Sequence, residues 1–178
     1  GLFSYPGDYF SAEAPAKYKI KGSYGHPVPV VDGKTQSAGS EAKAIVLRKE
    51  FTEEKDLFSI DYTSAYSTPN LDKLIRTFVY DRQGEGSFTV SDEFTADTPI
   101  RFETAITTQA DWKVLDDTRL LLTSGTEQMI VNIEASGKVA FTSETIEVNA
   151  PAYTRIGIAL KEQSEKGYIR LKMQAKQL

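Results

Sequence analysis

The stretch Leu57-Phe-Ser-Ile-Asp-Tyr-Thr63 alternates apolar and polar side chains at every second position. Phe58, Ile60 and Tyr62 therefore point to one side of an extended chain, and the polar residues between them point to the other. This period of two predicts a half-buried β-strand, because the apolar residues of a helix would recur every three or four positions.

The same pattern returns along most of the chain after Lys43. Turns rich in Gly, Asn, Asp and Ser separate the segments, and no helix of convincing length is expected. Each strand has one apolar face, and two sheets packed face to face bury both apolar faces. We therefore predict an all-β fold, a large antiparallel β-sandwich of two packed sheets with roughly a dozen strands. The further predicted strands lie at residues 44–50, 73–82, 87–94, 100–107, 112–115, 119–123, 129–134, 139–141, 155–160 and 168–173.

Composition restricts the class of protein. A length of 178 residues suits one domain, and we expect residues 1–178 to form a single sandwich domain. The 40% hydrophobic and 11% aromatic content excludes a disordered chain, and no apolar run is long enough to span a membrane. The net charge is −4, with lysines and acids interleaved, so neither nucleic acid nor a membrane is an expected partner.

The first residues resemble the middle of a protein rather than a beginning. Gly1 precedes the aromatic-rich stretch 2–10, which is unusual for a native amino terminus. We therefore expect a domain excised from a longer protein. The early tyrosines either pack with a hydroxyl reaching a partner or form a surface that stacks on sugars or contacts another domain. They are Tyr5, Tyr9, Tyr18 and Tyr24.

The only histidine of the chain, His26, is the candidate catalytic residue, because histidine titrates near neutral pH without special tuning. Pro27 restricts the residue before it to extended backbone, so His26 is not expected in a helix. Pro29 has no N–H and places this segment at a sheet edge or at the start of a strand, and Asp32-Gly33 predicts a tight turn. The simpler interpretation of His26 is a local hydrogen bond at a surface turn.

Other chemistry has weaker support. One histidine without cysteine cannot build a conventional zinc site, and the acidic residues lack EF-hand spacing. Asp92 and Glu93 would point to opposite faces of a strand, so they cannot act as an acid–base pair. The pairs 53–54 and 116–117 lie in predicted turns, where acids are normally solvated. We expect no metal and no cofactor.

Two stretches, Tyr5-Pro-Gly-Asp-Tyr-Phe10 and Gly25-His-Pro-Val-Pro-Val-Val-Asp-Gly-Lys-Thr-Gln36, resemble the carboxyl-terminal part of heparinase II/III-like polysaccharide lyases. Residues 76–80 and 88–94 are similar to the paired strands that follow in that family. The resemblance implies a β-sandwich preceded by an α/α toroid of helices, with the polysaccharide in the cleft between them. No part of this chain resembles the toroid, so a missing toroid domain is an expected partner.

The resemblance also implies a reaction, β-elimination on an acidic polysaccharide that contains uronic acid. It implies that the sandwich is inactive alone and contributes one histidine to the interdomain cleft. By position this residue is His26, and Tyr24 and Gln36 are the implied substrate-binding residues. A periplasmic or extracellular location is implied as well. Pro27 replaces the asparagine that usually follows the histidine, and the further histidines that bind zinc in some relatives are missing here.

Two other interpretations stay open. The chain could be a carbohydrate-binding or domain-docking β-sandwich module without a catalytic role, centred on exposed tyrosines. It could also be a structural spacer or assembly domain, which an exposed apolar patch without a polar cleft would favour.

Overall fold

A computed structural model describes residues 19–146 and 152–176 of the chain. Strands dominate these residues, and the only helices among them are single 3-10 turns. The turns are η1 (Lys19–Lys21), η2 (Ser23–Gly25) and η3 (Thr63–Ala65). The strands are β1 (Val30–Val31), β2 (Ile45–Phe51), β3 (Lys55–Asp61), β4 (Leu71–Asp81), β5 (Ser87–Ile100), β6 (Phe102–Thr108), β7 (Asp111–Asp116), β8 (Arg119–Ser124), β9 (Glu127–Ala135), β10 (Val139–Ile146), β11 (Tyr153–Leu160) and β12 (Ser164–Ala175).

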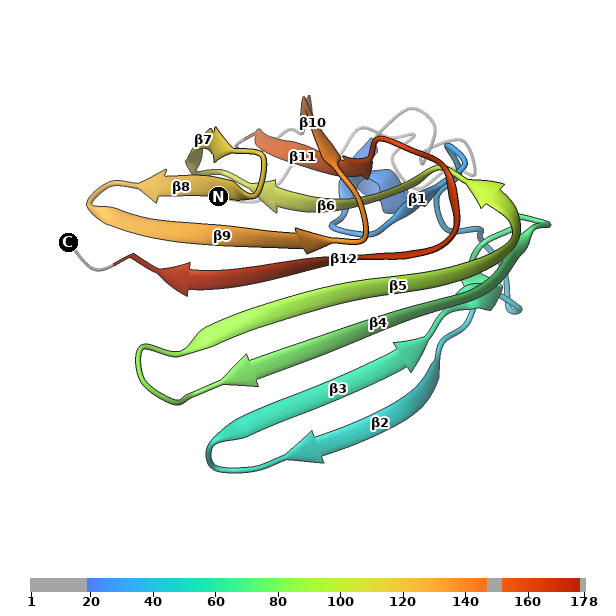
Figure 1. Cartoon of the computed structure of the whole chain (residues 1–178), viewed down its shortest axis with the longest axis horizontal. Coiled ribbons are helices and arrows are strands. Elements are labelled where there is room, and N and C mark those ends of the chain that lie inside the picture. The colour runs from blue at the N-terminus through green and yellow to red at the C-terminus, as the bar shows by residue number, and fades with distance from the viewer. Residues whose placement is uncertain (1–18, 147–151, 177–178) are drawn as a thin grey trace, which may run out of the picture.

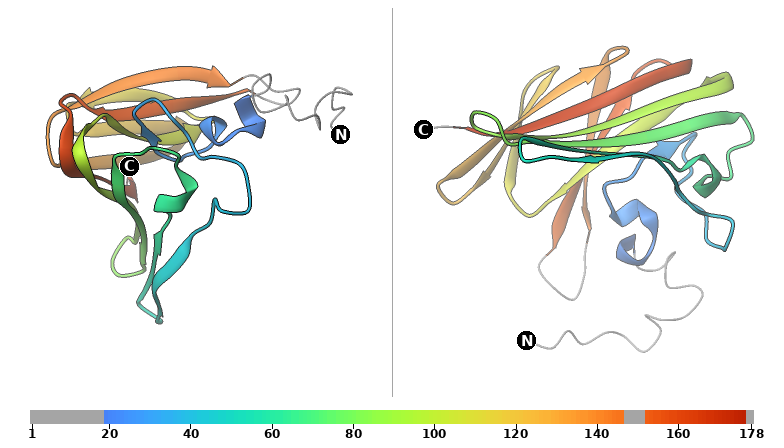
Figure 2. Two further views of the ribbon diagram at one scale, coloured as in Figure 1. Left: turned by 90° about the vertical axis from the view of Figure 1, so that its right-hand side faces the viewer. Right: turned by 90° about the horizontal axis from the view of Figure 1, so that it is seen from below.

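These strands form two sheets that lie one above the other (Figures 1 and 2). The small sheet has four strands in the order β1-β6-β11-β10, and the large sheet has eight in the order β2-β3-β4-β5-β12-β9-β8-β7. Neighbouring strands pair antiparallel throughout. The predicted all-β, two-sheet antiparallel sandwich is confirmed.

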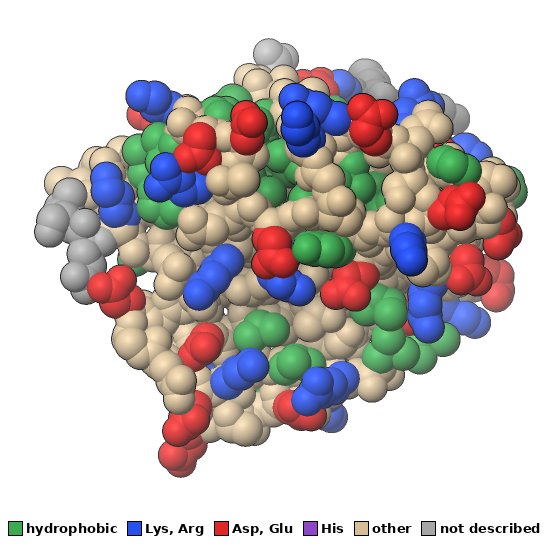
Figure 3. Space-filling view, viewed as in Figure 1, with side chains coloured by type: hydrophobic (Ala, Val, Ile, Leu, Met, Phe, Trp, Pro, Cys, Tyr) green, Lys and Arg blue, Asp and Glu red, His purple; other side chains and the backbone are tan. Residues whose placement is uncertain are grey.

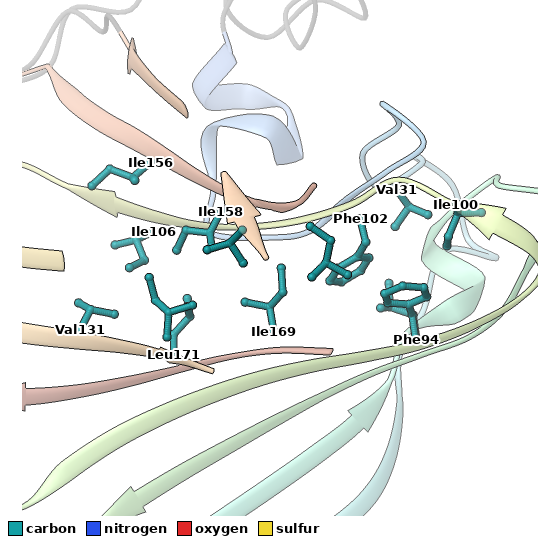
Figure 4. Close-up of a cluster of buried hydrophobic side chains, with 14 of the residues drawn as sticks. Val31, Phe94, Ile100, Phe102, Ile106, Val131, Ile156, Ile158, Ile169 and Leu171 are labelled. Atoms are coloured by element: carbon teal, nitrogen blue, oxygen red, sulfur yellow. The ribbon is translucent and has the colours of Figure 1, made fainter. Parts of the chain in front are cut away.

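The core lies between the two sheets, where apolar side chains from each sheet point toward those of the other (Figure 4). Ile156 and Ile158 of the small sheet and Ile169 of the large sheet have no exposed surface. Full burial of such a side chain contributes about 1.5–3 kcal/mol. The alternation predicted for β11 and β12 is therefore confirmed, because every second residue faces this core.

The strand predicted from Leu57–Thr63 is β3. Its Phe58 stacks on Phe78 of β4 with ring centroids 6.4 Å apart, and Phe78 stacks on Phe88 of β5 at 6.3 Å. The β2–β3 end of the large sheet extends away from the small sheet (Figure 2, left). Rings at this end consequently stay partly exposed, with 38% of Phe88 and 47% of Tyr80 accessible to solvent.

The alternation predicts one strand over residues 100–107, but the structure divides these residues between two strands. Strand β5 ends at Ile100 in the large sheet, and β6 begins at Phe102 in the small sheet. Arg101 between them exchanges hydrogen bonds with Asp32, through its backbone N–H to the carboxylate and through its carbonyl to the Asp32 N–H, both at 2.9 Å. Alternation cannot reveal this crossing, because Ile100 and Phe102 are both buried on either side of it.

A buried ion pair crosses the core side of the large sheet. Arg76 donates from Nε and Nη2 to the two carboxylate oxygens of Asp92, at 2.7 and 2.8 Å. Tyr62 and Thr104 add hydroxyl donors to the same carboxylate at 2.8 and 2.7 Å. Burial works against the charge of Arg76, but the charge and hydrogen bonds of Asp92 outweigh it and hold the pKa of Arg76 above its ordinary range. Glu93 is exposed on the opposite face, as predicted.

We expect Asp92→Asn to lower the free energy of unfolding by about 3–5 kcal/mol, because it leaves the buried guanidinium of Arg76 without a counter-charge. Urea denaturation measures this loss. Asp116→Asn is the matched control, since it removes a carboxylate from the exposed pair with Arg119, where ion pairs contribute little. Equal losses in the two variants would contradict the importance of the buried pair.

Candidate functional site

The candidate site is a hollow of about 320 Å³ beside the small sheet. The segment η1–η2, the end of β6 and the start of β11 form its walls. Hydroxyl groups, an amide and an imidazole border it, although more of its lining surface is apolar than polar. The lining residues are Ile20, Gly25, His26, Thr107, Thr108, Gln109 and Tyr153.

His26 directly follows η2 and has the extended backbone that the following proline predicts, with φ −114° and ψ 162°. Its side chain is exposed at the rim of the hollow, and Nε2 lies 3.1 Å from the carbonyl oxygen of Ile20. A carbonyl can only accept, so Nε2 carries the hydrogen of this bond and Nδ1 is the basic nitrogen of the neutral ring. The local hydrogen bond of the simpler interpretation is thus present, and the ring still borders the hollow.

The local structure around His26 agrees with the predictions made from the sequence. Pro29 leads into β1, which is an edge strand of the small sheet. Asp32 and Gly33 have positive φ angles of 49° and 77° and form the predicted turn. Gly25 is required by close packing, because a Cβ there would lie 2.5 Å from the carbonyl oxygen of Lys19. Only glycine therefore lets η1 pack against the residue before His26.

Tyr24 does not line the hollow. Its ring lies over the guanidinium of Arg155 at 4.4 Å, and its hydroxyl donates to Glu144 at 2.9 Å. Burial, followed by the bond to Glu144, raises the pKa of Tyr24. The alternation of β11 places Arg155 on a solvated face, but Arg155 is only 2% exposed and donates to Glu103 at 2.6 Å. That expectation is wrong because Tyr24 covers the outer face of the small sheet at this point.

Gln36 reaches the same region through its backbone. Its carbonyl oxygen lies 3.5 Å from the hydroxyl of Ser23 in η2, but Gln36 does not line the hollow. The structure thus places the three residues proposed from the sequence around η2, and His26 alone of the three borders the hollow. The substrate-binding roles of Tyr24 and Gln36 stay predictions.

Sequence reasoning missed the residues that complete the hollow. Thr107 and Tyr153 come from strands far along the chain from His26. Antiparallel pairing of β6 with β11 brings Thr107 and Tyr153 to one edge of the small sheet. No local sequence motif predicts this pairing. Tyr5, Tyr9 and Tyr18, with the stretch Tyr5–Phe10, lie outside the described residues.

Within residues 19–146 and 152–176, no group of three or more His, Cys, Asp or Glu side chains could hold a metal ion. No helix in these ranges is long and apolar enough to cross a membrane. On the face drawn in Figure 3, Lys and Arg side chains alternate with Asp and Glu. This face of the large sheet therefore has no continuous basic surface for a phosphate backbone.

No protein-family model and no curated protein sequence matches this chain. Solved structures match it over its whole length. Heparan sulfate lyase HepC from Pedobacter heparinus superimposes with a TM-score of 0.73 at 14% identity, over 100% of this chain and 28% of that one. The fold is that of a segment of heparinase III. A heparinase III gene product gives 0.73 at 12% identity over 99% and 27% of the two chains, and a further heparinase III structure gives 0.64 at 17% over 84% and 23%.

The expected resemblance is thereby confirmed at the level of the fold. This chain spans about 28% of the length of the heparan sulfate lyase that it matches. At sequence identities of 12–17%, the similarity supports the same fold but does not assign active-site residues in this chain.

Glu144 accepts hydrogen bonds from Lys19 and from Tyr24, and these bonds lower the pKa of Glu144. A lowered folded-state pKa stabilises the protein above the unfolded-state pKa, and the contribution is lost as the pH falls through the folded-state value. We expect Glu144→Gln to be less stable than the wild type at neutral pH by at most about 1 kcal/mol, because solvent screens the pair. Urea unfolding across a pH series should show this difference closing below about pH 4. A difference that persists at lower pH would contradict the role of the Glu144 charge.

Proposed function

We propose that this chain is the β-sandwich domain of a heparinase II/III-like polysaccharide lyase, excised from a longer protein with a helical toroid domain. In this proposal residues 1–178 form one domain that is inactive alone and contributes His26 to the interdomain cleft. The substrate is an acidic polysaccharide that contains uronic acid, and the location is periplasmic or extracellular.

One observation carries the proposal. Over 84–100% of its length, the chain has the fold of about a quarter of a heparan sulfate lyase and of two heparinase III structures. Fold similarity of this extent supports a lyase-related domain. The exposed imidazole of His26 at the rim of this hollow supports the placement of the histidine at a surface that a second domain completes.

The reaction would be β-elimination at a uronic acid. Removal of the weakly acidic C5 proton places negative charge on the adjacent carboxylate, and donors around that carboxylate stabilise the transition state. A base takes the proton, and an acid delivers one to the departing glycosidic oxygen.

His26 suits two steps of this reaction. With Nε2 donating to Ile20, the Nδ1 of the neutral ring can accept a proton as a base. When Nδ1 is protonated, the ring is a cation that can donate to the uronate carboxylate. The bond to Ile20 fixes the ring in either state, which is what a positioned catalytic group requires.

The test uses the full reading frame that encodes this chain together with its helical domain. Uronic-acid polymers are the substrates, and ultraviolet absorbance reports the unsaturated product. We expect His26→Ala to lower turnover by about 100-fold or more, the usual contribution of a general acid or base. The urea midpoint should change little, because His26 is exposed. Wild-type turnover in this variant would remove His26 from the mechanism.

A second candidate function, a domain-docking module, is favoured by strand β2. All seven residues of this edge strand are exposed, and its apolar side chains include Ile45 at 62% and Phe51 at 63% exposure. Exposed apolar residues that gather on one element are typical of an interaction surface. A helical domain packed on β2 would bury them, with or without catalysis by His26.

We expect Leu47→Ser and Phe51→Ser to weaken association with a separately produced helical domain, because both remove exposed apolar surface from β2. Calorimetry measures the binding. Val114→Ser is the control, since it removes an exposed apolar side chain, although a less exposed one, from β7 at the opposite edge of the large sheet. Equal weakening by all three variants would contradict docking at β2, and glycan binding by the isolated chain would favour a carbohydrate-binding module.

A further inference from the structure

Side chains, rather than strand pairing, hold the segment that carries His26. Residues 25–29 run from η2 to β1, and the carbonyl oxygen of every second residue accepts a hydrogen bond from a side chain. Each of the three donors comes from a different part of the fold. Tyr153 Oη donates to Gly25 at 2.6 Å, Arg76 Nη1 donates to Pro27 at 2.7 Å, and Tyr66 Oη donates to Pro29 at 2.9 Å.

The two prolines explain why side chains, and not a neighbouring strand, donate hydrogen bonds to this segment. Pro27 and Pro29 have no N–H, so this segment cannot form a regular ladder with a neighbouring strand. Its carbonyl groups still need donors where they are shielded from water, as at the buried Pro29. The three side chains supply these donors on both sides of His26.

Two of the three donors, Arg76 and Tyr66, are buried and have little freedom to move. Arg76 is 7% exposed, and its other two nitrogens are committed to Asp92. Tyr66 is 6% exposed and packs edge to face on Tyr62 with ring centroids 5.8 Å apart. Burial raises the pKa of Tyr66, so its hydroxyl keeps its proton and stays a donor. Donors with so little freedom fix the carbonyls that they bind.

The three donors connect His26 to both sheets. Arg76 lies on β4 of the large sheet, Tyr153 lies on β11 of the small sheet, and Tyr66 follows η3. We propose that Arg76, Tyr66 and Tyr153 are positioning residues that fix His26 at the rim of the hollow. Their importance for turnover rests on the proposed function, whereas their effect on the imidazole does not.

The single histidine makes this effect directly measurable. In a chain without a polyhistidine tag, the carbon-bound imidazole protons of His26 give one set of NMR signals. Tyr66→Phe and Tyr153→Phe each delete one hydroxyl and keep the ring. Tyr168→Phe is the matched control, because its hydroxyl donates to Glu134 on the large sheet, away from residues 25–29. Arg76→Lys keeps the charge beside Asp92 but loses the planar fork that reaches both Asp92 and Pro27.

We expect Tyr66→Phe and Tyr153→Phe to shift or broaden the His26 signals, Arg76→Lys to do so more strongly, and Tyr168→Phe to leave them unchanged. Urea midpoints identify any variant that unfolds, and the two tyrosine variants decide the question if Arg76→Lys does not fold. Folded tyrosine variants with wild-type His26 signals would overturn the proposal. Full turnover by His26→Ala in the complete lyase would instead end the proposed function and leave the NMR result standing.

Discussion

The buried pair of Arg76 and Asp92 is the interaction on which the rest of the structure depends. Two charges can stay in an apolar core only when their hydrogen-bonding capacity is filled, and here Tyr62 and Thr104 complete the carboxylate. Thr104 lies on β6 of the small sheet, whereas Arg76 and Asp92 lie on the large sheet. The bond from Thr104 to Asp92 thus joins the two sheets through the buried pair.

The same arginine extends this constraint to the candidate site. Its remaining nitrogen binds the carbonyl of Pro27, next to His26. A segment with two prolines cannot take its position from strand pairing, so its position comes from the core through side chains. The only imidazole of the chain is exposed to solvent, yet the backbone on either side of it is hydrogen-bonded to side chains from both sheets. An exposed group on a rigid support is the arrangement that binding and catalysis require.

The sequence was sufficient to predict the strands, because burial of one face leaves a period of two in the chain itself. It also indicated His26, since the backbone limits imposed by Gly25 and Pro27 are local. It did not predict the sheet crossing at Arg101, the burial of Arg155 or the part that Tyr153 takes in the hollow. Each of these features depends on which distant segment packs against the residue. Alternation shows only that one face of a strand is buried, and it does not show by which segment. The sequence pattern around an arginine on the polar face of a strand is the same whether water or Tyr24 covers that arginine.

Strand β2 shows how the protein manages an open sheet edge. A row of unpaired backbone groups with apolar side chains invites a second chain to add a strand, which is the first step toward fibrils. In β2 the pairing with β3 shifts register between Val46 and Arg48. Beyond this irregularity the strand carries charged side chains, namely Lys49 and the ion pair of Arg48 with Glu50. A register shift and charged side chains on an edge strand discourage pairing with identical copies. The strand that is proposed to dock a second domain thus also carries features that oppose pairing with its own copies.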